Sequence, residues 1–304
     1  MKHNQVPFRC QHEIDGIRAD NAAGAAEILR RAAAIFLLVD PSEYGDIAQA
    51  RASIAGLCEN LARAQPNMAS VFNLAQAVKA AAWLAANPDD AVEYATKAAE
   101  AFLRRSAAAG AAAAKHTASL INAGTTLLTH SRSSTVLSAI SIASANGIRF
   151  KVIVTESRPV MEGRTLAAQL ASAGLPVTLI ADAAAALVLR DKPDLVLVGA
   201  DTVTPEAVVN KIGTFMISLA ARENLVPVHT VCDTTKFIAS TGSGSLHHQE
   251  QNPLELWPDA PTNVKVTNQY FEETPLRYFS SVITEEGPLS ATEAARQAAT
   301  NTPL

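Results

Sequence analysis

The sequence predicts an α/β protein in which an N-terminal helical domain precedes a Rossmann-like, doubly wound parallel sheet. Residues 12 to about 120 are rich in alanine, and their larger apolar residues recur at helical spacing. From about residue 122, short β-type runs alternate with helical segments, which is the pattern of βαβ units. We therefore expect a helical domain over 1–120 and a sheet domain over 121–304, with the boundary near Ile121.

Four alanine-rich stretches are expected to form the helices of the first domain. They are "NAAGAAEILRRAAAIFLLV", "IAQARASIAGLCENLARAQP", "MASVFNLAQAVKAAAWLAANP" and residues 89–121. Two of them stop at prolines, Pro66 and Pro88. The last stretch has acids early and arginines late, which suits the helix dipole if the helix breaks near Gly110. Because small alanine faces let helices approach closely, the pattern predicts a compact bundle.

Six apolar runs are expected to be strands of the second domain. They are "TTLLTH", "FKVIVTES", "PVTLIAD", "DLVLVGAD", "VPVHTVCD" and "SVIT". These runs are uniformly apolar instead of alternating, as expected when helices cover both faces of a parallel sheet. The segments between them, such as "NKIGTFMISLAARENL", are expected to be crossover helices.

The composition argues against several classes of protein. A net charge of -4, with 48% hydrophobic and 18% charged residues, gives no general reason to expect direct nucleic-acid binding. Three isolated cysteines fit a reducing cytosol and not a disulfide framework. Signal-peptide and membrane-helix patterns are absent. The adjacent His247 and His248 lie in a Gly/Ser/Pro-rich stretch that predicts a surface loop. We expect a cytoplasmic chain without a metal or other cofactor.

Polar residues gather where the predicted strands end, which is where open parallel sheets bind ligands. They are His130, Ser131, Arg132, Ser133, Ser134, Glu156, Arg158, Asp182, Asp201 and Asp233. Any α/β protein caps helices with Ser or Asp, so Ser134, Asp182 and Asp233 are each more simply explained as caps. Asp201 resists that explanation, because the next helix-like segment begins well after it, at Asn210.

These strand ends favour a phosphorylated small molecule as the ligand. Arg132 and Arg158 supply planar cations that suit phosphate oxygens. Ser131, Ser133 and Ser134 open a predicted helix, whose free backbone amides form a ready anion site. The sequence has no GxGxxG or GxxxxGK[ST] pattern, which argues against a dinucleotide or a Walker-type nucleotide.

Several motifs, in the same order along the chain, resemble one known family. They are "THSRSSTVLSAI", "VTESRPVMEGRTLAAQLASAGLPVTLIAD", "GADTVTPEAVVNKIGTFMISLAA" and "VITEEG". They look like the family of the α, β and δ subunits of translation initiation factor 2B. That family also contains methylthioribose-1-phosphate isomerase and ribose-1,5-bisphosphate isomerase. The resemblance, strong over 122–287, implies an N-terminal helical domain and a Rossmann-like domain that binds a phosphosugar and dimerises.

The resemblance also implies roles for individual residues. In the isomerases, the aspartate that matches Asp201 works with a cysteine after the first strand. Together they move protons between C1 and C2 of a ring-opened sugar phosphate, while the positions that match Asn210 and Lys211 hold the substrate. This chain has Ser131 in place of that cysteine. An alkyl hydroxyl is a far weaker acid than a thiol, so the substitution predicts weak or no proton transfer.

The N-terminal domain departs from the family as well. Arg18, Ala19 and Asp20 match a phosphate-contacting Arg-Gly-Ala segment, but the glycine is missing and an acid lies beside the expected phosphate. Gln65 stands where the family has an arginine. These departures predict reduced phosphate affinity or a ligand with only one phosphate.

Three hypotheses for function follow. The first is a protein like the regulatory α-type subunits, which binds a phosphorylated sugar or a nucleotide monophosphate with weak or no isomerase activity. Its expected binding residues are Arg18, His130, Arg132, Ser133, Ser134, Glu156, Arg158, Asn210 and Lys211. The second is an aldose–ketose isomerase for a ribose-phosphate-type substrate, an intramolecular oxidoreductase that uses Asp201 with Ser131. The third is a structural partner in a translation-factor-like complex. We expect a homodimer or a higher homo-oligomer.

Overall fold

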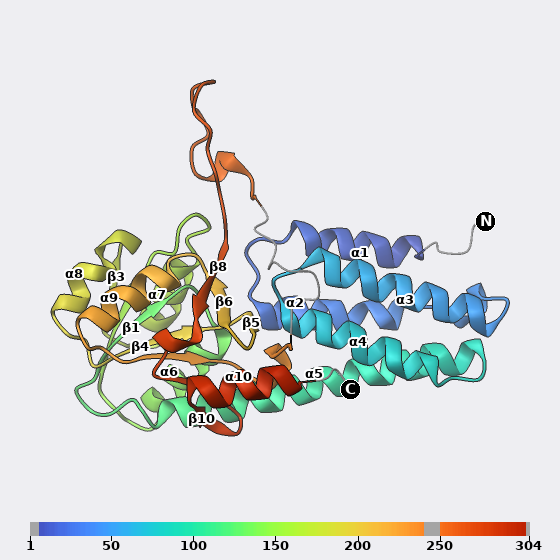
Figure 1. The fold of residues 1–304 in the computed structure, drawn as a ribbon, viewed down its shortest axis with the longest axis horizontal. Coiled ribbons are helices and arrows are strands. Elements are labelled where there is room, and N and C mark those ends of the chain that lie inside the picture. Colours follow the sequence, from blue (N-terminus) through green and yellow to red (C-terminus); the bar gives the residue numbers. More distant parts are fainter. Residues whose placement is uncertain (1–5, 240–249, 302–304) are drawn as a thin grey trace.

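The structure is a computed structural model that describes residues 6–239 and 250–301. It confirms the predicted α/β fold, with a helical N-terminal region beside a mostly parallel central sheet (Figure 1). His247 and His248 lie outside the described residues, so the surface loop expected there stays a prediction.

Five α-helices form the N-terminal region. They are α1 (Phe8–Ala19), α2 (Ala25–Ala34), α3 (Ile47–Ala64), α4 (Ala69–Trp83) and α5 (Pro88–Ala118). Their apolar faces enclose one core, in which Ile28, Leu57 and Leu74 are fully buried. Ala32 and Ala50 have no exposed surface and lie among these larger side chains. Because alanine adds little bulk, the helices can pack closely around the larger residues.

Seven strands form the central sheet, in the order β10-β9-β7-β4-β1-β2-β3. They are β1 (Thr126–His130), β2 (Lys151–Thr155), β3 (Val177–Ile180), β4 (Leu195–Gly199), β7 (Val228–Val231), β9 (Ser281–Thr284) and β10 (Gly287–Leu289). All neighbours pair in parallel except β10, which pairs with β9 in the antiparallel direction. The strand order reverses between β1 and β4. This is the switch point of a doubly wound sheet, where two diverging connections leave a crevice.

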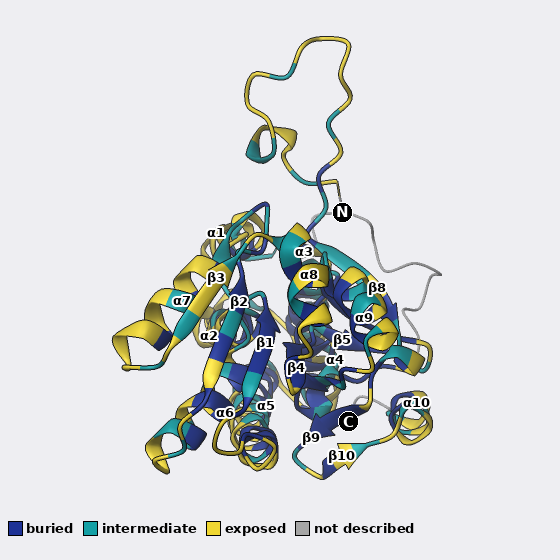
Figure 2. Ribbon diagram, turned by 90° about the vertical axis from the view of Figure 1, so that its left-hand side faces the viewer, coloured by how far each residue is buried: buried dark blue, intermediate teal, exposed yellow. Residues whose placement is uncertain are grey.

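Helices cover both faces of this sheet (Figure 2). They are α6 (Ser134–Ala145), α7 (Glu162–Ser172), α8 (Ala185–Arg190), α9 (Thr214–Glu223) and α10 (Ala291–Thr300). On β4, Leu195 and Leu197 belong to the core shared with α5, α6 and α7. Val196 and Val198 belong to the core shared with α8, α9 and α10. Burial on both faces explains why the strand is apolar at every position.

The predicted break near Gly110 is wrong, because α5 runs unbroken through it. The first half of α5 packs in the helical core, which includes Phe102, and its second half packs in a sheet core, which includes Ala113. A Cβ atom at Gly110 would lie 3.9 Å from Oγ1 of Thr135 on α6, so this glycine is at a helix contact. Packing on both sides therefore holds the helix through a residue of low helix propensity. The predicted boundary near Ile121 falls just after this shared helix.

A second sheet of three antiparallel strands does not follow from the sequence pattern. It consists of β5 (Thr202–Val203), β6 (Ala207–Lys211) and β8 (Phe271–Pro275). The helix expected to begin at Asn210 is wrong at its start, because Asn210 and Lys211 end β6 and α9 begins at Thr214. The pairing of β6 with β8, which lies far along the chain, stabilises the strand here. A local pattern cannot reveal such a long-range partner.

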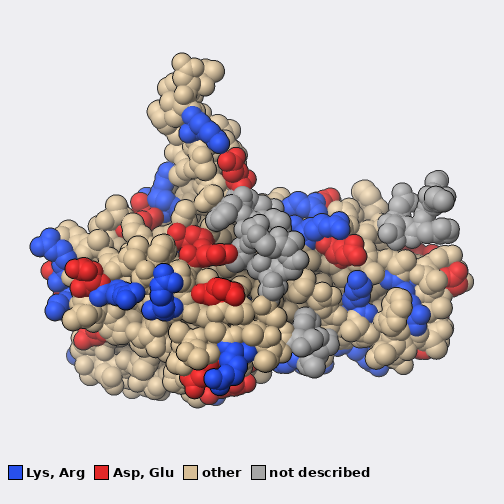
Figure 3. All heavy atoms as spheres, viewed as in Figure 1, with Lys and Arg blue, Asp and Glu red and all other residues tan. Residues whose placement is uncertain are grey.

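The surface carries charges of both signs. Lys and Arg side chains are interspersed with Asp and Glu over the face shown in Figure 3. Within residues 6–239 and 250–301, no helix combines the length and the apolar character needed to cross a bilayer. The segment between η5 (Pro253–Glu255) and β8 extends away from the body in both ribbon views (Figures 1 and 2).

Candidate functional site

A cavity opens at the carboxyl ends of β1 and β4, at the switch point of the central sheet. The volume of the cavity is about 100 Å³, and the cavity opens to the solvent. Residues from the helical region, from both sheets and from the segment before β8 line it. The cavity therefore depends on the packing of the helical region against the sheet region.

One wall of the cavity contains the amino terminus of α2. Gly24 is the N-cap and no side chain caps this end, so the first amides of the helix are left for a ligand or water. Asp20 holds the preceding loop by accepting hydrogen bonds from the amides of Ala22 (3.0 Å) and Ala23 (2.8 Å), and it pairs with Arg31. Burial opposes ionisation of Asp20, but these amides and Arg31 lower its pKa overall. The acid expected beside the phosphate is thus already paired within the protein.

The amino terminus of α6 opens into the same cavity. Four predicted site residues line this part of the wall, namely Ser131, Arg132, Ser133 and Ser134. The Oγ atom of Ser133 caps the helix by accepting a hydrogen bond from the amide of Val136 (3.3 Å). A Cβ atom at Gly199, the last residue of β4, would lie only 2.8 Å from Cβ of Ser133. Glycine is therefore needed for β4 to approach α6, and two helix amino termini can attract one anion.

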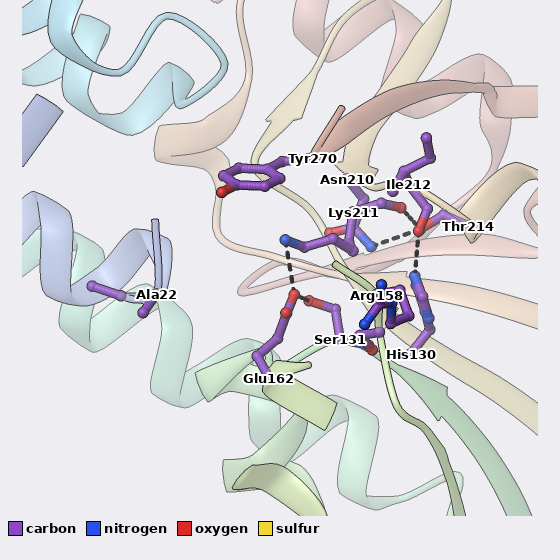
Figure 4. A network of polar contacts seen from close by, with 12 residues as sticks. Ala22, His130, Ser131, Arg158, Glu162, Asn210, Lys211, Ile212, Thr214 and Tyr270 are labelled. Atoms are coloured by element: carbon purple, nitrogen blue, oxygen red, sulfur yellow. Dashed lines mark hydrogen bonds and ion pairs between the residues drawn. The ribbon is translucent and has the colours of Figure 1, made fainter. Parts of the chain in front are cut away.

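Another part of the cavity wall carries a buried ion pair (Figure 4). Nζ of Lys211, at the end of β6, lies 2.9 Å from Oε1 of Glu162, the first residue of α7. Both side chains are about nine-tenths buried, with 8% and 11% exposed. Oγ of Ser131 donates a hydrogen bond to the same Oε1 at 2.8 Å. The ammonium also lies 4.9 Å from the ring centre of Tyr270 and 5.5 Å from that of Phe271.

Asp201 follows β4 and lines the cavity. Among the described residues, its carboxylate makes no hydrogen bond and no ion pair within 4.0 Å. Burial raises the pKa of this carboxyl above its ordinary value, although the ammonium groups of Lys236 and Lys211 oppose the shift. Lys236 also lines the cavity, and its Nζ donates to the backbone oxygen of Ala200 at 2.6 Å. A desolvated carboxyl with an elevated pKa is suited to accept or release a proton.

His130 lines the cavity, but both of its ring nitrogens have protein partners. Nε2 lies 2.8 Å from the backbone oxygen of Ile212, and Nδ1 lies 2.6 Å from Oγ1 of Thr155. A carbonyl can only accept, so Nε2 carries the proton and Nδ1 accepts from the threonine hydroxyl. Burial lowers the pKa of His130, which keeps the ring neutral. His130 therefore holds the turn between β6 and α9 in place. Neither ring nitrogen is left free to make the predicted contact with a ligand.

The remaining predicted binding residues divide into two groups. Asn210 and Arg18 line the cavity, and Nδ2 of Asn210 donates to Oγ1 of Thr214 at 3.0 Å. Glu156 and Arg158 are not among the lining residues. Glu156 forms an ion pair with Arg164 at 2.8 Å instead. Arg158 extends its guanidinium toward the backbone oxygen of Leu256, 3.5 Å away. The structure thus does not bring these two side chains to the cavity.

Several residues of the cavity are absent from the predicted site. They are Glu162, Lys236, Tyr270, Phe271 and the residues at the start of α2. Glu162 opens a helix, where an acid alone is usually explained by the helix dipole. Tyr270 and Phe271 reach Lys211 only through the pairing of β6 with β8. No group of three or more His, Cys, Asp or Glu residues in the described part of the chain is placed to hold a metal.

A helical N-terminal region thus packs against the switch point of a doubly wound sheet, with two helix amino termini facing one cavity. This arrangement defines an α/β protein with a polar small-molecule cavity that is suited to anions. Residues 21–291 match the model of the initiation factor 2 subunit family. The chain belongs to this family.

Proteins similar to this chain are named either as sugar-phosphate isomerases or as translation initiation factors. It is 33% identical over 301 residues to 5-deoxyribose 1-phosphate isomerase of Moorella thermoacetica, a match that covers 92% of this chain and 86% of that protein. It is 43% identical over 173 residues to ribose 1,5-bisphosphate isomerase of Archaeoglobus fulgidus, which covers 56% of this chain and 55% of that protein. A crystal structure of translation initiation factor eIF-2B from Pyrococcus horikoshii OT3 is similar with a TM-score of 0.82 and 33% identity, covering 93% and 98% of the two chains.

Proposed function

We propose that this chain binds a phosphorylated sugar in the switch-point cavity and has weak or no isomerase activity. The observation that carries the proposal is the convergence of the α2 and α6 amino termini on a cavity that also holds Asp201. Phosphate binds at the helix ends, where backbone amides and the helix dipoles favour an anion. The sugar hydroxyls lie toward Asp201, Asn210 and Lys211, which offer both donors and acceptors.

Weak isomerase activity is proposed because Ser131 stands where the isomerases of the family have the cysteine that works with the aspartate matching Asp201. A thiol has a pKa of about 8.5, whereas the pKa of an alkyl hydroxyl is higher by several units and closer to that of water. Ser131 occupies the place of the family's cysteine, and its hydroxyl already donates to Glu162. That hydrogen bond leaves the proton of Ser131 directed at the protein and not at a ligand.

A second candidate function is aldose–ketose isomerisation of a sugar phosphate. One observation favours it, namely that burial raises the pKa of Asp201 while its carboxylate has no partner among the described residues. Such a group can act as a general base near neutral pH. The names of two relatives, which are isomerases of sugar phosphates, add support.

Isothermal titration calorimetry tests the binding proposal. The ligands are ribose 5-phosphate, ribose 1,5-bisphosphate, 5-deoxyribose 1-phosphate, methylthioribose 1-phosphate and adenosine monophosphate, with free ribose as the control. We expect saturable binding of at least one phosphorylated sugar and none of ribose. Binding of adenosine monophosphate alone would identify the nucleotide as the ligand class, and no binding at all would contradict the proposal.

Deuterium exchange at C2 of the bound sugar, followed by NMR, separates binding from chemistry. We expect slow or no exchange with the wild-type chain and faster exchange with Ser131→Cys, which restores a thiol. Asp201→Asn should abolish whatever exchange is seen, because it removes the base. Rapid exchange by the wild type that disappears in Asp201→Asn would instead establish the isomerase.

We propose further that the chain forms a homodimer or a higher homo-oligomer, and that a translation-factor-like protein is a candidate partner. The resemblance of the sheet region to a dimerising family supports the first statement. The printed names of relatives such as translation initiation factor eIF-2B support the second. Light scattering coupled to size-exclusion chromatography measures the oligomer directly, and a monomer at micromolar concentration would contradict it.

A further inference from the structure

Glu162 is a carboxylate that the proposed phosphosugar function does not explain. It opens α7, its side chain is 11% exposed, and it faces the cavity beside Lys211. Its Oε1 accepts from both Ser131 and Lys211, whereas Oε2 is buried and has no hydrogen-bond partner among the described residues. Burying a carboxylate with one oxygen that has no hydrogen-bond partner costs free energy. The negative charge of Glu162 therefore affects the binding of any charged group nearby.

The first consequence concerns Lys211. The side chain of Lys211 is deeply buried at the cavity, with 8% exposed. Its ammonium lies 2.9 Å from Glu162, whose charge neutralises it. The flanking rings of Tyr270 and Phe271 further satisfy the cation. A phosphate placed against Lys211 would therefore meet a neutral pair, with a carboxylate at contact distance from the same ammonium. Most of the attraction that a free lysine offers to phosphate is cancelled there.

The side chains around the Lys211–Glu162 pair form what we call the charged wall, and its other members are no more favourable to an anion. The Asp201 carboxyl is close enough for Glu162 to add to the upward shift of its pKa, after burial has made the largest contribution. Lys236 supplies a second ammonium, but its Nζ donates to the backbone oxygen of Ala200. Two carboxyl groups thus accompany two ammonium groups on this wall. The part of the cavity formed by the amino termini of α2 and α6, which we call the helix-end wall, is different. Its one carboxylate among the described residues, Asp20, is already paired with Arg31.

Resting on the proposed function, we infer that Glu162 determines specificity by admitting sugars with one phosphate and disfavouring a second phosphate at the Lys211 wall. The single phosphate binds at the α2 and α6 amino termini. The other end of the ligand is uncharged and meets the Lys211–Glu162 pair through hydroxyl groups, which can donate to a carboxylate and accept from an ammonium. A bisphosphate must place its second dianion beside Glu162, where repulsion lowers its affinity.

Calorimetry with ribose 5-phosphate, ribose 1-phosphate and ribose 1,5-bisphosphate tests the inference on the wild type and on Glu162→Gln. We expect the wild type to bind at least one monophosphate no more weakly than the bisphosphate. Glu162→Gln keeps the shape and one acceptor but removes the charge, so it should improve the bisphosphate-to-monophosphate affinity ratio on the order of tenfold. Glu156→Gln is the matched control, because Glu156 pairs with Arg164 outside the cavity, and it should leave the ratio unchanged.

The outcomes separate this inference from the function on which it rests. A wild type that binds the bisphosphate tenfold more tightly than either monophosphate would overturn the inference without any variant, even if Glu162→Gln fails to fold. An unchanged ratio in folded Glu162→Gln, or an equal change in Glu156→Gln, would also overturn it. Either result leaves phosphosugar binding intact. No binding of any of the three sugars would instead contradict the proposed function itself.

Discussion

Two walls of the cavity are built by different means. The helix-end wall, formed by the amino termini of α2 and α6, relies on backbone amides and on the Ser133 cap. The charged wall is built from side chains, with Lys211 and Glu162 about nine-tenths buried and Asp201 partly buried beside the same cavity. Backbone amides are present whatever the side chain, whereas buried charges depend on each partner. The first wall should therefore tolerate substitution and the second should not.

Removing one member of the buried pair should produce the largest loss of stability. Lys211→Met keeps the aliphatic stem beside Tyr270 but leaves Glu162 buried without its cation. We expect a cost of about 4 kcal/mol in the free energy of unfolding, measured by guanidinium denaturation. Adding Glu162→Gln should recover part of this loss, because the double variant has no uncompensated charge.

Lys97→Met is the control for that variant. It breaks an exposed ion pair with Glu93 on α5, which should be nearly neutral. If Lys211→Met and Lys97→Met cost the same, the charges at the cavity are solvated and the contrast between the two walls fails.

The charged wall also depends on a glycine that places Glu162. A Cβ atom at Gly163 would lie 1.9 Å from the backbone oxygen of Thr155 at the end of β2, so α7 can meet this strand only without a side chain there. Gly163→Ala should cost about 3 kcal/mol in unfolding free energy and weaken ligand binding as α7 moves. Gly45→Ala, where the nearest atoms are 3.5 Å away in the Gln49 side chain, should be close to neutral. Equal melting temperatures for both variants would contradict the close approach.

The sequence anticipates the walls to different degrees. Ser131 to Ser134 and Asp201 could be predicted because the ends of parallel strands converge whatever the details of packing. Glu162 could not, since an acid in the first turn of a helix is common and its meaning depends on Lys211 across the cavity. The start of α2 carries no side-chain signal, because Gly24 and the following alanines contribute only backbone amides. Sequence patterns therefore reveal sites built from strand ends better than sites built from backbone or from paired elements.

The same limit applies to the fold. The doubly wound sheet is predictable from local apolar runs, because each strand is buried on both faces. The β5–β6–β8 sheet is not, since β6 acquires its partner from residues far along the chain. Arg158 shows that the position of a residue after a strand does not fix where its side chain lies. It follows β2, yet its side chain extends toward Leu256 and not into the cavity.

Asp201 permits a test of the charged wall by pH. Burial raises the folded-state pKa above the unfolded value, which is about 3.9 for aspartate. The folded chain then binds this proton more tightly, so the wild type loses stability relative to Asp201→Asn as pH rises from the unfolded pKa through the folded one. We expect Asp201→Asn to have a higher melting temperature than the wild type at pH 7, with a smaller difference at pH 4.

Asp40→Asn should show the opposite trend in those melts. Hydrogen bonds from the hydroxyl and amide of Ser42 lower the pKa of Asp40, so its charge favours the folded state as pH rises. A pH-independent difference for Asp201→Asn would mean that the Asp201 carboxyl is not desolvated, and the general-base candidacy would lose its support.

The helix-end wall should give the smallest effect. Ser133→Ala removes the cap of α6 and should cost about 1 kcal/mol in unfolding free energy. Ser290→Ala removes the capping box of α10, whose first residues do not line the cavity, and should cost about the same. The backbone amides of α6 remain in place in Ser133→Ala, so phosphosugar affinity in calorimetry should fall only about threefold, against no change in Ser290→Ala. A hundredfold loss in Ser133→Ala would show that the serine hydroxyl, and not the amides, binds the phosphate. The helix-end wall would then be as dependent on single side chains as the charged one.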